Sequence, residues 1–259
     1  MGISDQAVRY LRYRMCSKSR FGVHSPFVFD LISELHNGRR KREETAPVER
    51  IRNKLERDRR LIRREDHGRE PAISYSLGVG EIARKHAIRP VYGRVLFKLV
   101  KKYRPARILE LGTSLGISTS YLHLGHPEAA LVSIEACAET HRLAGENPLL
   151  AKKPGVHLLC GRFQDRLDEA ISMLGGIDLA FIDGHHREAA TIRYFQQIMK
   201  AVSNDSILVF DDIHHSDEME RAWAAIIRDE RVRVSIDLFS LGLIFFKKEL
   251  SREAFVLRF

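Results

Sequence analysis

The feature that most constrains the fold is a regular alternation of short apolar runs and helix-like segments after residue 104. Apolar runs that predict strands occupy residues 106–111, 130–135, 156–160, 177–183, 206–210, 233–238 and 241–247. Helical patterns fill the intervals at residues 117–124, 137–146, 164–174, 187–202 and 217–229. Apolar strands that alternate with helices indicate a parallel sheet covered on both faces. Because a tight connection around Ser240 joins the last two runs, we predict an α/β fold of seven strands whose last strand is antiparallel.

The first 104 residues show helical patterns and no convincing strand. Helices are predicted at residues 5–17, 24–37, 47–64 and 90–103. In the first of them, Val8, Leu11 and Met15 recur at helical spacing. Residues 66–80 are rich in loop-forming glycine and proline, and we expect a mobile loop there. The sequence therefore predicts a helical extension over 1–104 and an α/β domain over 105–259.

Composition narrows the class of protein. No run approaches the roughly 18 apolar residues of a membrane span, and the first fifteen residues lack the apolar centre of a signal peptide. The three cysteines, Cys16, Cys137 and Cys160, have no C-x-x-C spacing. Such cysteines indicate reduced thiols, so we expect a cytoplasmic protein without a membrane partner.

The net charge of +9 is unevenly distributed. Residues 39–64 hold twelve Lys or Arg and only five Asp or Glu. This segment predicts either a surface for nucleic acid or a solvated helix whose charges pair with each other. It contains no aromatic residue that could stack on bases, which favours the solvated helix.

Residues 108–119 read ILELGTSLGIST, and their two glycines admit several interpretations. A dinucleotide site needs G-x-G-x-x-G, and the spacing GTSLG does not match it. A hydrolase is a second interpretation, because residues 112–116 match G-x-S-x-G with Ser114 as the nucleophile. Asp183 or Asp211, followed by His214, would complete a triad in the usual order, but no upstream segment resembles an oxyanion loop.

The third interpretation is a site for S-adenosylmethionine. Its usual pattern is an acid at the end of the first strand, then E-L-G-x-x-x-G, then an acid at the end of the second strand. Glu110, Gly112, Gly116 and Glu135 fit this pattern. The glycines would let the backbone approach a ligand that carries no phosphate, and the Glu135 carboxylate could accept both ribose hydroxyls.

Residues 106–247 resemble a class I S-adenosylmethionine-dependent methyltransferase. Beyond ILELGTSLGIST, the segments VSIEA, GRFQDRL, IDLAFIDGHH and ILVFDDIHHS follow in the family's order and spacing. They are most similar to the small-molecule O-methyltransferases in the neighbourhood of catechol O-methyltransferase. The resemblance implies a Rossmann-like sheet. It also implies a set of cofactor-binding residues: Glu110, Gly112, Thr113, Gly116, Ser118, Glu135, Ala136, Arg162, Phe163 and Asp183.

A second group of polar residues follows the fourth and fifth predicted strands: Asp183, His185, His186, Asp211, Asp212, His214 and His215. In the metal-dependent members of the family, three oxygen ligands hold a divalent ion, usually magnesium. The matching positions here are Asp183, Asp211 and Asp212, although the third is commonly asparagine in the family. A histidine base, either His185 or His214, is the metal-free alternative, and methyl transfer by alignment alone is a third.

These observations predict an enzyme that methylates an oxygen of a small polar acceptor, with S-adenosylmethionine as cofactor and a divalent metal as a candidate helper. We expect the N-terminal extension to cover the acceptor pocket or to form a homodimer interface. Two alternatives stay open. One is a nucleic-acid methyltransferase that uses the basic 39–64 segment, and the other is a cofactor-binding scaffold without catalysis.

Overall fold

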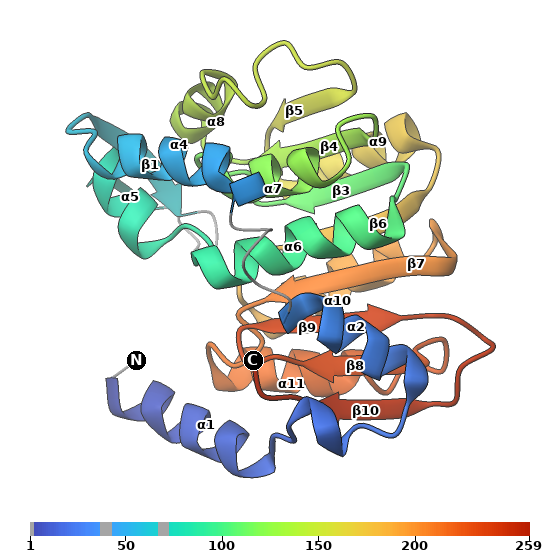
Figure 1. The fold of residues 1–259 in the computed structure, drawn as a ribbon. Coiled ribbons are helices and arrows are strands. Elements are labelled where there is room, and N and C mark those ends of the chain that lie inside the picture. The colour runs from blue at the N-terminus through green and yellow to red at the C-terminus, as the bar shows by residue number, and fades with distance from the viewer. Residues whose placement is uncertain (1–2, 37–42, 67–72) are drawn as a thin grey trace. The chain divides into compact units, whose positions relative to one another are not determined.

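The computed structural model of the chain describes residues 3–36, 43–66 and 73–259 (Figure 1). It divides into two compact units, residues 1–37 with 176–259 and residues 38–175. These units do not follow the sequence-based boundary near residue 104, which stays a prediction. Each unit is described by itself below.

The first unit contains five strands of the central sheet and five helical segments. Its helices are α1 (Ile3–Cys16), the short 3-10 helix η1 (Arg20–Gly22), α2 (Pro26–His36), α10 (Glu188–Ile198) and α11 (Asp217–Ile226). Its strands are β6 (Ile177–Ile182), β7 (Val202–Asp211), β8 (Val234–Asp237), β9 (Leu241–Phe245) and β10 (Glu253–Val256). They lie in the order β10-β8-β9-β7-β6.

The second unit contains three parallel strands, a separate hairpin and six helices among its described residues. Its helices are α4 (Ala46–Glu56), α5 (Val79–Lys85), α6 (Pro90–Tyr103), α7 (Ile117–Gly125), α8 (Ala138–Gly145) and α9 (Phe163–Leu174). Its strands are β3 (Arg107–Leu111), β4 (Ala130–Glu135) and β5 (Val156–Cys160), in that order, with the hairpin β1 (Leu61–Asp66) and β2 (Ile73–Gly78).

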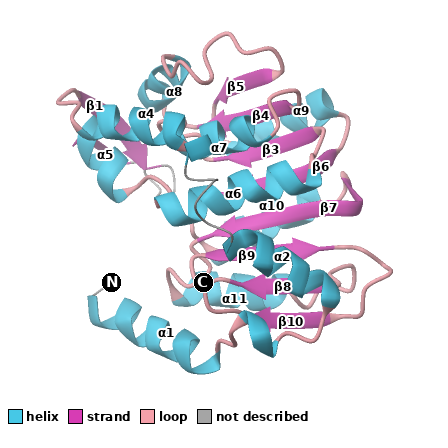
Figure 2. Ribbon diagram, viewed as in Figure 1, coloured by secondary structure: helices cyan, strands magenta, loops and turns pink. Residues whose placement is uncertain are grey.

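The predicted α/β fold is confirmed, and the alternation of helix and strand is visible in Figure 2. All seven predicted strands form, as β3 to β9. The antiparallel strand is also confirmed, since β9 pairs antiparallel with β7 and β8. An eighth strand, β10, pairs parallel with β8 and was not predicted, because four residues with little apolar periodicity give no strand signal.

The prediction of helices without strands before residue 104 is wrong for residues 61–66 and 73–78. The predicted helix over 47–64 ends at Glu56, and residues 61–66 pair antiparallel with residues 73–78 instead. The predicted loop over 66–80 thus contributes β2 and the start of α5, while its residues 67–72 lie outside the described residues. Periodicity over the charged segment could not distinguish a helix from a short hairpin, because β1 buries only Ile62 among its described side chains.

The helix α1 presents a different face to its unit than its apolar pattern indicates. Val8, Leu11 and Met15 are 55%, 62% and 87% exposed, whereas Tyr13 is 5% exposed. Arg9 pairs with two acids of α11, and the Tyr13 hydroxyl donates to a backbone carbonyl near the chain's end. These polar anchors therefore decide which face of α1 docks. None of the described helices is both long enough and apolar enough to cross a membrane.

Close packing of α6 on α7 supports the strands of the second unit. Gly93 of α6 faces the ring of Tyr121 of α7, which is fully buried. A Cβ at Gly93 would lie 2.2 Å from the nearest ring atom of Tyr121. The ring therefore occupies space that only a glycine leaves open.

We predict that Gly93→Ala lowers the free energy of unfolding by about 1–3 kcal/mol, the usual cost of overpacking a filled core. Gly145→Ala is the matched control, because a Cβ at this helical glycine would meet no atom within 4 Å. Urea denaturation of both variants measures the difference. Equal stability of the two variants would show that the α6–α7 contact is not as tight as described.

Candidate functional site

The glycine turn after β3 lies where the sequence predicts a cofactor. Gly112 and Gly116 have φ angles of 104° and 74°, in the region that favours glycine. The backbone N–H groups of Gly112 and Thr113 donate to the carbonyl of Ile134 at 3.0 and 3.2 Å, so the turn is fixed to the end of β4. The Gly116 N–H closes the turn on the Thr113 carbonyl at 2.8 Å.

The Glu135 carboxylate connects this turn to the loop that follows β4. Its Oε2 accepts the N–H of Ser114 at 2.7 Å, and its Oε1 accepts the N–H of Cys137 at 2.8 Å. Glu135 is 6% exposed. Each oxygen retains a second acceptor site, so the group can still bind hydroxyls of a ligand. The carboxylate is thus held by two backbone donors at the carboxyl end of its strand.

Glu110, near the end of β3, is fully buried, and only one of its two carboxyl oxygens forms hydrogen bonds. Its Oε2 accepts hydrogen bonds from the hydroxyls of Thr119 and Ser133, while its Oε1 has no hydrogen-bond partner among the described residues. Burial raises the pKa of Glu110 from 4.5 to about 7, against the effect of its hydroxyl donors. An orphaned oxygen on a buried carboxyl group is a feature of a ligand site more than of a stabilised core.

The other predicted cofactor residues in this unit follow the same three strands. Ser118 is buried in the first turn of α7, and Ala136 directly follows Glu135. Phe163 begins α9 and is 6% exposed, whereas Arg162 before it is half exposed and pairs with Asp165 at 2.8 Å. Because β3, β4 and β5 are parallel neighbours, their carboxyl ends bring these residues to one edge.

Two supports of the turn were missed by the sequence reasoning. The amide of Asn147 donates to the carbonyl of Gly116 at 3.2 Å and to the Ser120 hydroxyl at 2.9 Å. The hydroxyl of Thr113 pairs with that of Ser133. The sequence analysis named Thr113 but not its partner Ser133, and one asparagine after a helix is an ordinary loop residue. Only the fold shows that Asn147 holds the C-terminal glycine of the turn.

In the first unit, three carboxylates gather at the ends of β6 and β7. Burial, with the nearby charges of Asp183 and Asp212, raises the pKa of Asp211 well above its usual range. Asp212 has a φ of 54°, a left-handed conformation rare for residues other than glycine and asparagine. Within the described part of the chain, no group of three or more His, Cys, Asp or Glu side chains is arranged to hold a metal ion.

Two histidines lie beside these acids. His185 and His186 have φ angles of 64° and 36°, so the loop after β6 is strained at both. The Nδ1 of His185 lies 2.9 Å from the hydroxyl of the buried Tyr194. The Nε2 of His186 lies 3.5 Å from Asp183, and burial lowers the pKa of His186.

His214 does not have the geometry of a general base. Its Nδ1 lies 2.9 Å from Glu220 and its Nε2 lies 2.8 Å from Asp237, so carboxylates occupy both ring nitrogens. Burial alone would lower the pKa of His214, but these two hydrogen bonds raise it. The ring stacks on Phe239 at 5.4 Å. A charged imidazolium held in this way has no nitrogen left to accept a substrate's proton, so His214 supports the loop after β7 instead.

The hydrolase interpretation finds no support around Ser114. Ser114 has a φ of 47°, and its backbone N–H donates to the Glu135 carboxylate. Its hydroxyl has no hydrogen-bond partner in any part of the chain that the structure describes. A serine nucleophile needs a base within hydrogen-bonding reach. The strained turn therefore presents backbone groups and not an activated hydroxyl.

Comparison with known proteins agrees with this geometry. Residues 109–213 match the family described as "Methyltransferase domain". The match begins within β3 and extends past the acids that follow β7. These residues form a methyltransferase domain. None of the curated proteins compared with the sequence matches it.

Solved structures show the same fold at low identity. An O-methyltransferase from Bacillus cereus in complex with SAH is 21% identical, with a TM-score of 0.53 over 62% of this chain and 83% of that one. TomG, an O-methyltransferase of tomaymycin synthesis from Streptomyces achromogenes, in complex with SAM, is 20% identical, with a TM-score of 0.54 over 71% and 92%. An SAH-bound methyltransferase from Podospora anserina is 18% identical, with a TM-score of 0.55 over 80% and 97%.

The raised pKa of Glu110 makes the stability of the methyltransferase domain depend on pH. Because the folded pKa is about 7 and the usual value is 4.5, stability is greatest below pH 4.5 for this group and is lost as the pH rises towards 7. Glu110→Gln, which mimics the protonated acid, should therefore gain stability relative to the wild type between pH 5 and pH 8.

Urea denaturation at these two pH values tests this prediction. Glu169→Gln is the control, because Glu169 is about half exposed on α9. Identical pH dependence of the Glu110→Gln variant and the wild type would contradict the raised pKa of Glu110.

Proposed function

We propose that this protein is an S-adenosylmethionine-dependent O-methyltransferase that acts on a small polar acceptor. One observation carries the proposal: the Glu135 carboxylate is held between the glycine turn and the loop after β4 by two backbone N–H groups. A carboxylate fixed there suits the two vicinal hydroxyls of a ribose. The methyltransferase domain over residues 109–213 and the SAH- or SAM-bound neighbours support the same cofactor.

The residues of the second unit fit the parts of this cofactor. The backbone of residues 112–116 can approach the ligand closely, because the two glycines at its ends adopt positive φ angles. Ala136 and Phe163, after β4 and β5, would flank the adenine. Glu110 places a carboxyl group with an orphaned oxygen below the turn, which suits a ligand that carries positive charge. When bound, S-adenosylmethionine would supply an activated methyl group.

The acceptor's proton needs a destination, and His185 is our candidate base. The Tyr194 hydroxyl lies 2.9 Å from Nδ1 of His185 and fixes the orientation of the ring, as a general base requires. Asp183, which precedes this loop, would orient the acceptor. Alignment of acceptor and methyl group supplies the remaining acceleration.

Divalent-metal assistance is a further part of the proposal. Asp183, Asp211 and Asp212 would hold the ion, and magnesium suits an all-oxygen set. Burial is the main cause of the raised pKa of Asp211, and the repulsion from Asp183 and Asp212 that adds to it is the kind that a cation relieves. Such an ion would favour the deprotonated form of an acceptor hydroxyl.

A nucleic-acid acceptor is the second candidate function, and the surface of α4 favours it. Arg50 and Lys54 of this helix and Arg57, directly after it, are exposed, and no described residue forms an ion pair with them. Other cations of the basic segment are paired: Arg52 with Glu49, and Arg60 with Asp58 and Glu146. The paired residues support the solvated helix, so this function ranks second. Residues 39–42 lie outside the described residues.

Titration with S-adenosylhomocysteine in a calorimeter tests the cofactor site. We expect micromolar binding by the wild type and loss of at least tenfold in Glu135→Ala, because the ribose loses a fixed acceptor. Glu169→Ala, remote from the turn on the exposed side of α9, should bind like the wild type. A wild type that does not bind S-adenosylhomocysteine would overturn the proposed function.

Titration with Mn²⁺, followed by electron paramagnetic resonance, tests the metal. We expect one ion per chain and loss of binding in Asp212→Ala, which removes the ligand oxygen, with Asp205→Ala as the exposed control. Because a ligating carboxylate must be deprotonated and Asp211 has a raised pKa, binding should weaken as the pH is lowered. The metal part of the proposal fails if the wild type retains no ion.

A further inference from the structure

A segment that the methyltransferase family match does not cover lies along α8 in the second unit. This segment, residues 58–63, is called the β1 segment below, and it precedes the matched region by more than forty residues. It contacts both ends of α8 and the side of the helix between them. Because α8 begins directly after the loop that holds Glu135, the β1 segment lies beside the proposed cofactor site.

At the start of α8, the backbone N–H and the backbone carbonyl of Arg63 both form hydrogen bonds. Its N–H donates to the carboxylate of Glu139 at 2.9 Å, and its carbonyl accepts the thiol of Cys137 at 3.4 Å. Cys137 is also the residue whose N–H holds Glu135. One residue therefore connects the proposed ribose carboxylate to the β1 segment.

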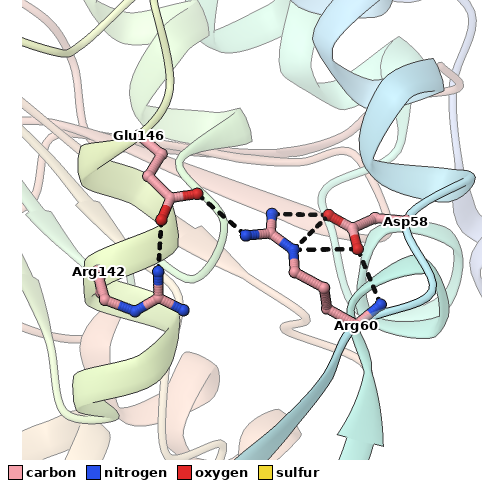
Figure 3. Close-up of polar contacts among 4 residues, drawn as sticks. All are labelled: Asp58, Arg60, Arg142 and Glu146. Atoms are coloured by element: carbon pink, nitrogen blue, oxygen red, sulfur yellow. Dashed lines mark hydrogen bonds and ion pairs between the residues drawn. The ribbon is translucent and has the colours of Figure 1, made fainter.

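At the end of α8, an ion-pair chain closes the contact, as Figure 3 shows. Arg60 pairs with Asp58 at 2.7 Å and with Glu146 at 3.2 Å. Glu146 also accepts from Arg142, one turn earlier on α8. Arg60 and Glu146 are each about half exposed. These ion pairs therefore add only a small stabilisation to the contact between the β1 segment and α8.

Between these ends, an apolar cluster fixes the segment to the glycine turn itself. Ile62 is 3% exposed and belongs to one cluster with Leu115 of the turn and Leu143 of α8. Val79, Ile82 and Ala83 of α5 complete the cluster. The same segment thus packs on the turn, on α8 and on the loop between them.

We propose that the β1 segment is part of the cofactor site and closes its adenosine side. The proposal rests on the proposed function, because it assigns the segment to that same ligand. A segment fixed to both Leu115 and Cys137 cannot be displaced without loosening the two backbone groups that hold Glu135. The N-terminal part of the chain therefore serves the adenosine end of the cofactor through these residues, whatever other role it has towards the acceptor.

Calorimetry with S-adenosylhomocysteine on three variants tests the proposal. Arg60→Ala should raise Kd about two- to fivefold, the size expected for a half-exposed ion pair. Arg59→Ala is the matched control: it removes the neighbouring exposed guanidinium, for which no described partner is recorded, and should leave Kd unchanged. Ile62→Ala should raise Kd tenfold or more, because it removes the buried side chain by which the segment joins the cluster.

Hydrogen–deuterium exchange gives a second measurement that needs no variant. If the β1 segment contributes to cofactor affinity, the cofactor must stabilise the docked segment in return. Addition of S-adenosylhomocysteine to the wild type should therefore slow exchange of the Ile62 and Arg63 amides at least fivefold. Exchange of the β9 amides in the other unit is the internal control and should stay constant. Slower exchange at Arg63 alone therefore separates this effect from a general change in stability.

The outcomes are distinct from those of the proposed function. A wild type that does not bind S-adenosylhomocysteine overturns both proposals. Binding by the wild type with unchanged Kd in Arg60→Ala and Ile62→Ala, and with unchanged exchange at residues 62–63, overturns the role of the β1 segment alone. Slowed exchange with a raised Kd in Ile62→Ala supports it.

Discussion

The second unit depends on one arrangement: a buried carboxylate that accepts backbone N–H groups from two separate turns. Glu135 receives Ser114 from the glycine turn and Cys137 from the loop before α8. Charge-assisted hydrogen bonds of this kind are stronger than neutral ones, and here they connect Ser114 and Cys137, which are more than twenty residues apart in the chain. The site is therefore built by the same contacts that close the fold at this edge of the strands.

Each unit keeps a buried carboxyl group at a cost to stability. Glu110 is buried with an oxygen that has no partner, and Asp211 lies among other acids, so burial and repulsion raise the pKa of both. Neither arrangement stabilises the folded chain. Groups of this kind concentrate where a ligand supplies the missing partner, which is why they mark functional sites. His214 is the opposite case: two carboxylates fully satisfy it, and its role is support.

The sequence predicted most of the methyltransferase domain because its signals are local. The strands from β3 to β9 lie in short segments rich in apolar residues, and the glycine turn carries its own pattern. The hairpin of β1 and β2 could not be predicted, because its single described buried side chain, Ile62, gives no period. The face of α1 that packs against its unit could not be predicted either, because the contacts of Arg9 and Tyr13, and not the apolar stripe, determine it. Asn147 and the bridging role of Cys137 depend on tertiary contacts alone.

A crystal structure of the complex with S-adenosylhomocysteine tests the central claim most directly. The account predicts both ribose hydroxyls within about 3 Å of the Glu135 carboxylate oxygens, a normal hydrogen-bond distance. It also predicts that the Ser114 and Cys137 amides remain bonded to that carboxylate. A ligand bound with its ribose away from Glu135, or a Glu135 side chain turned away from both amides, would contradict the account.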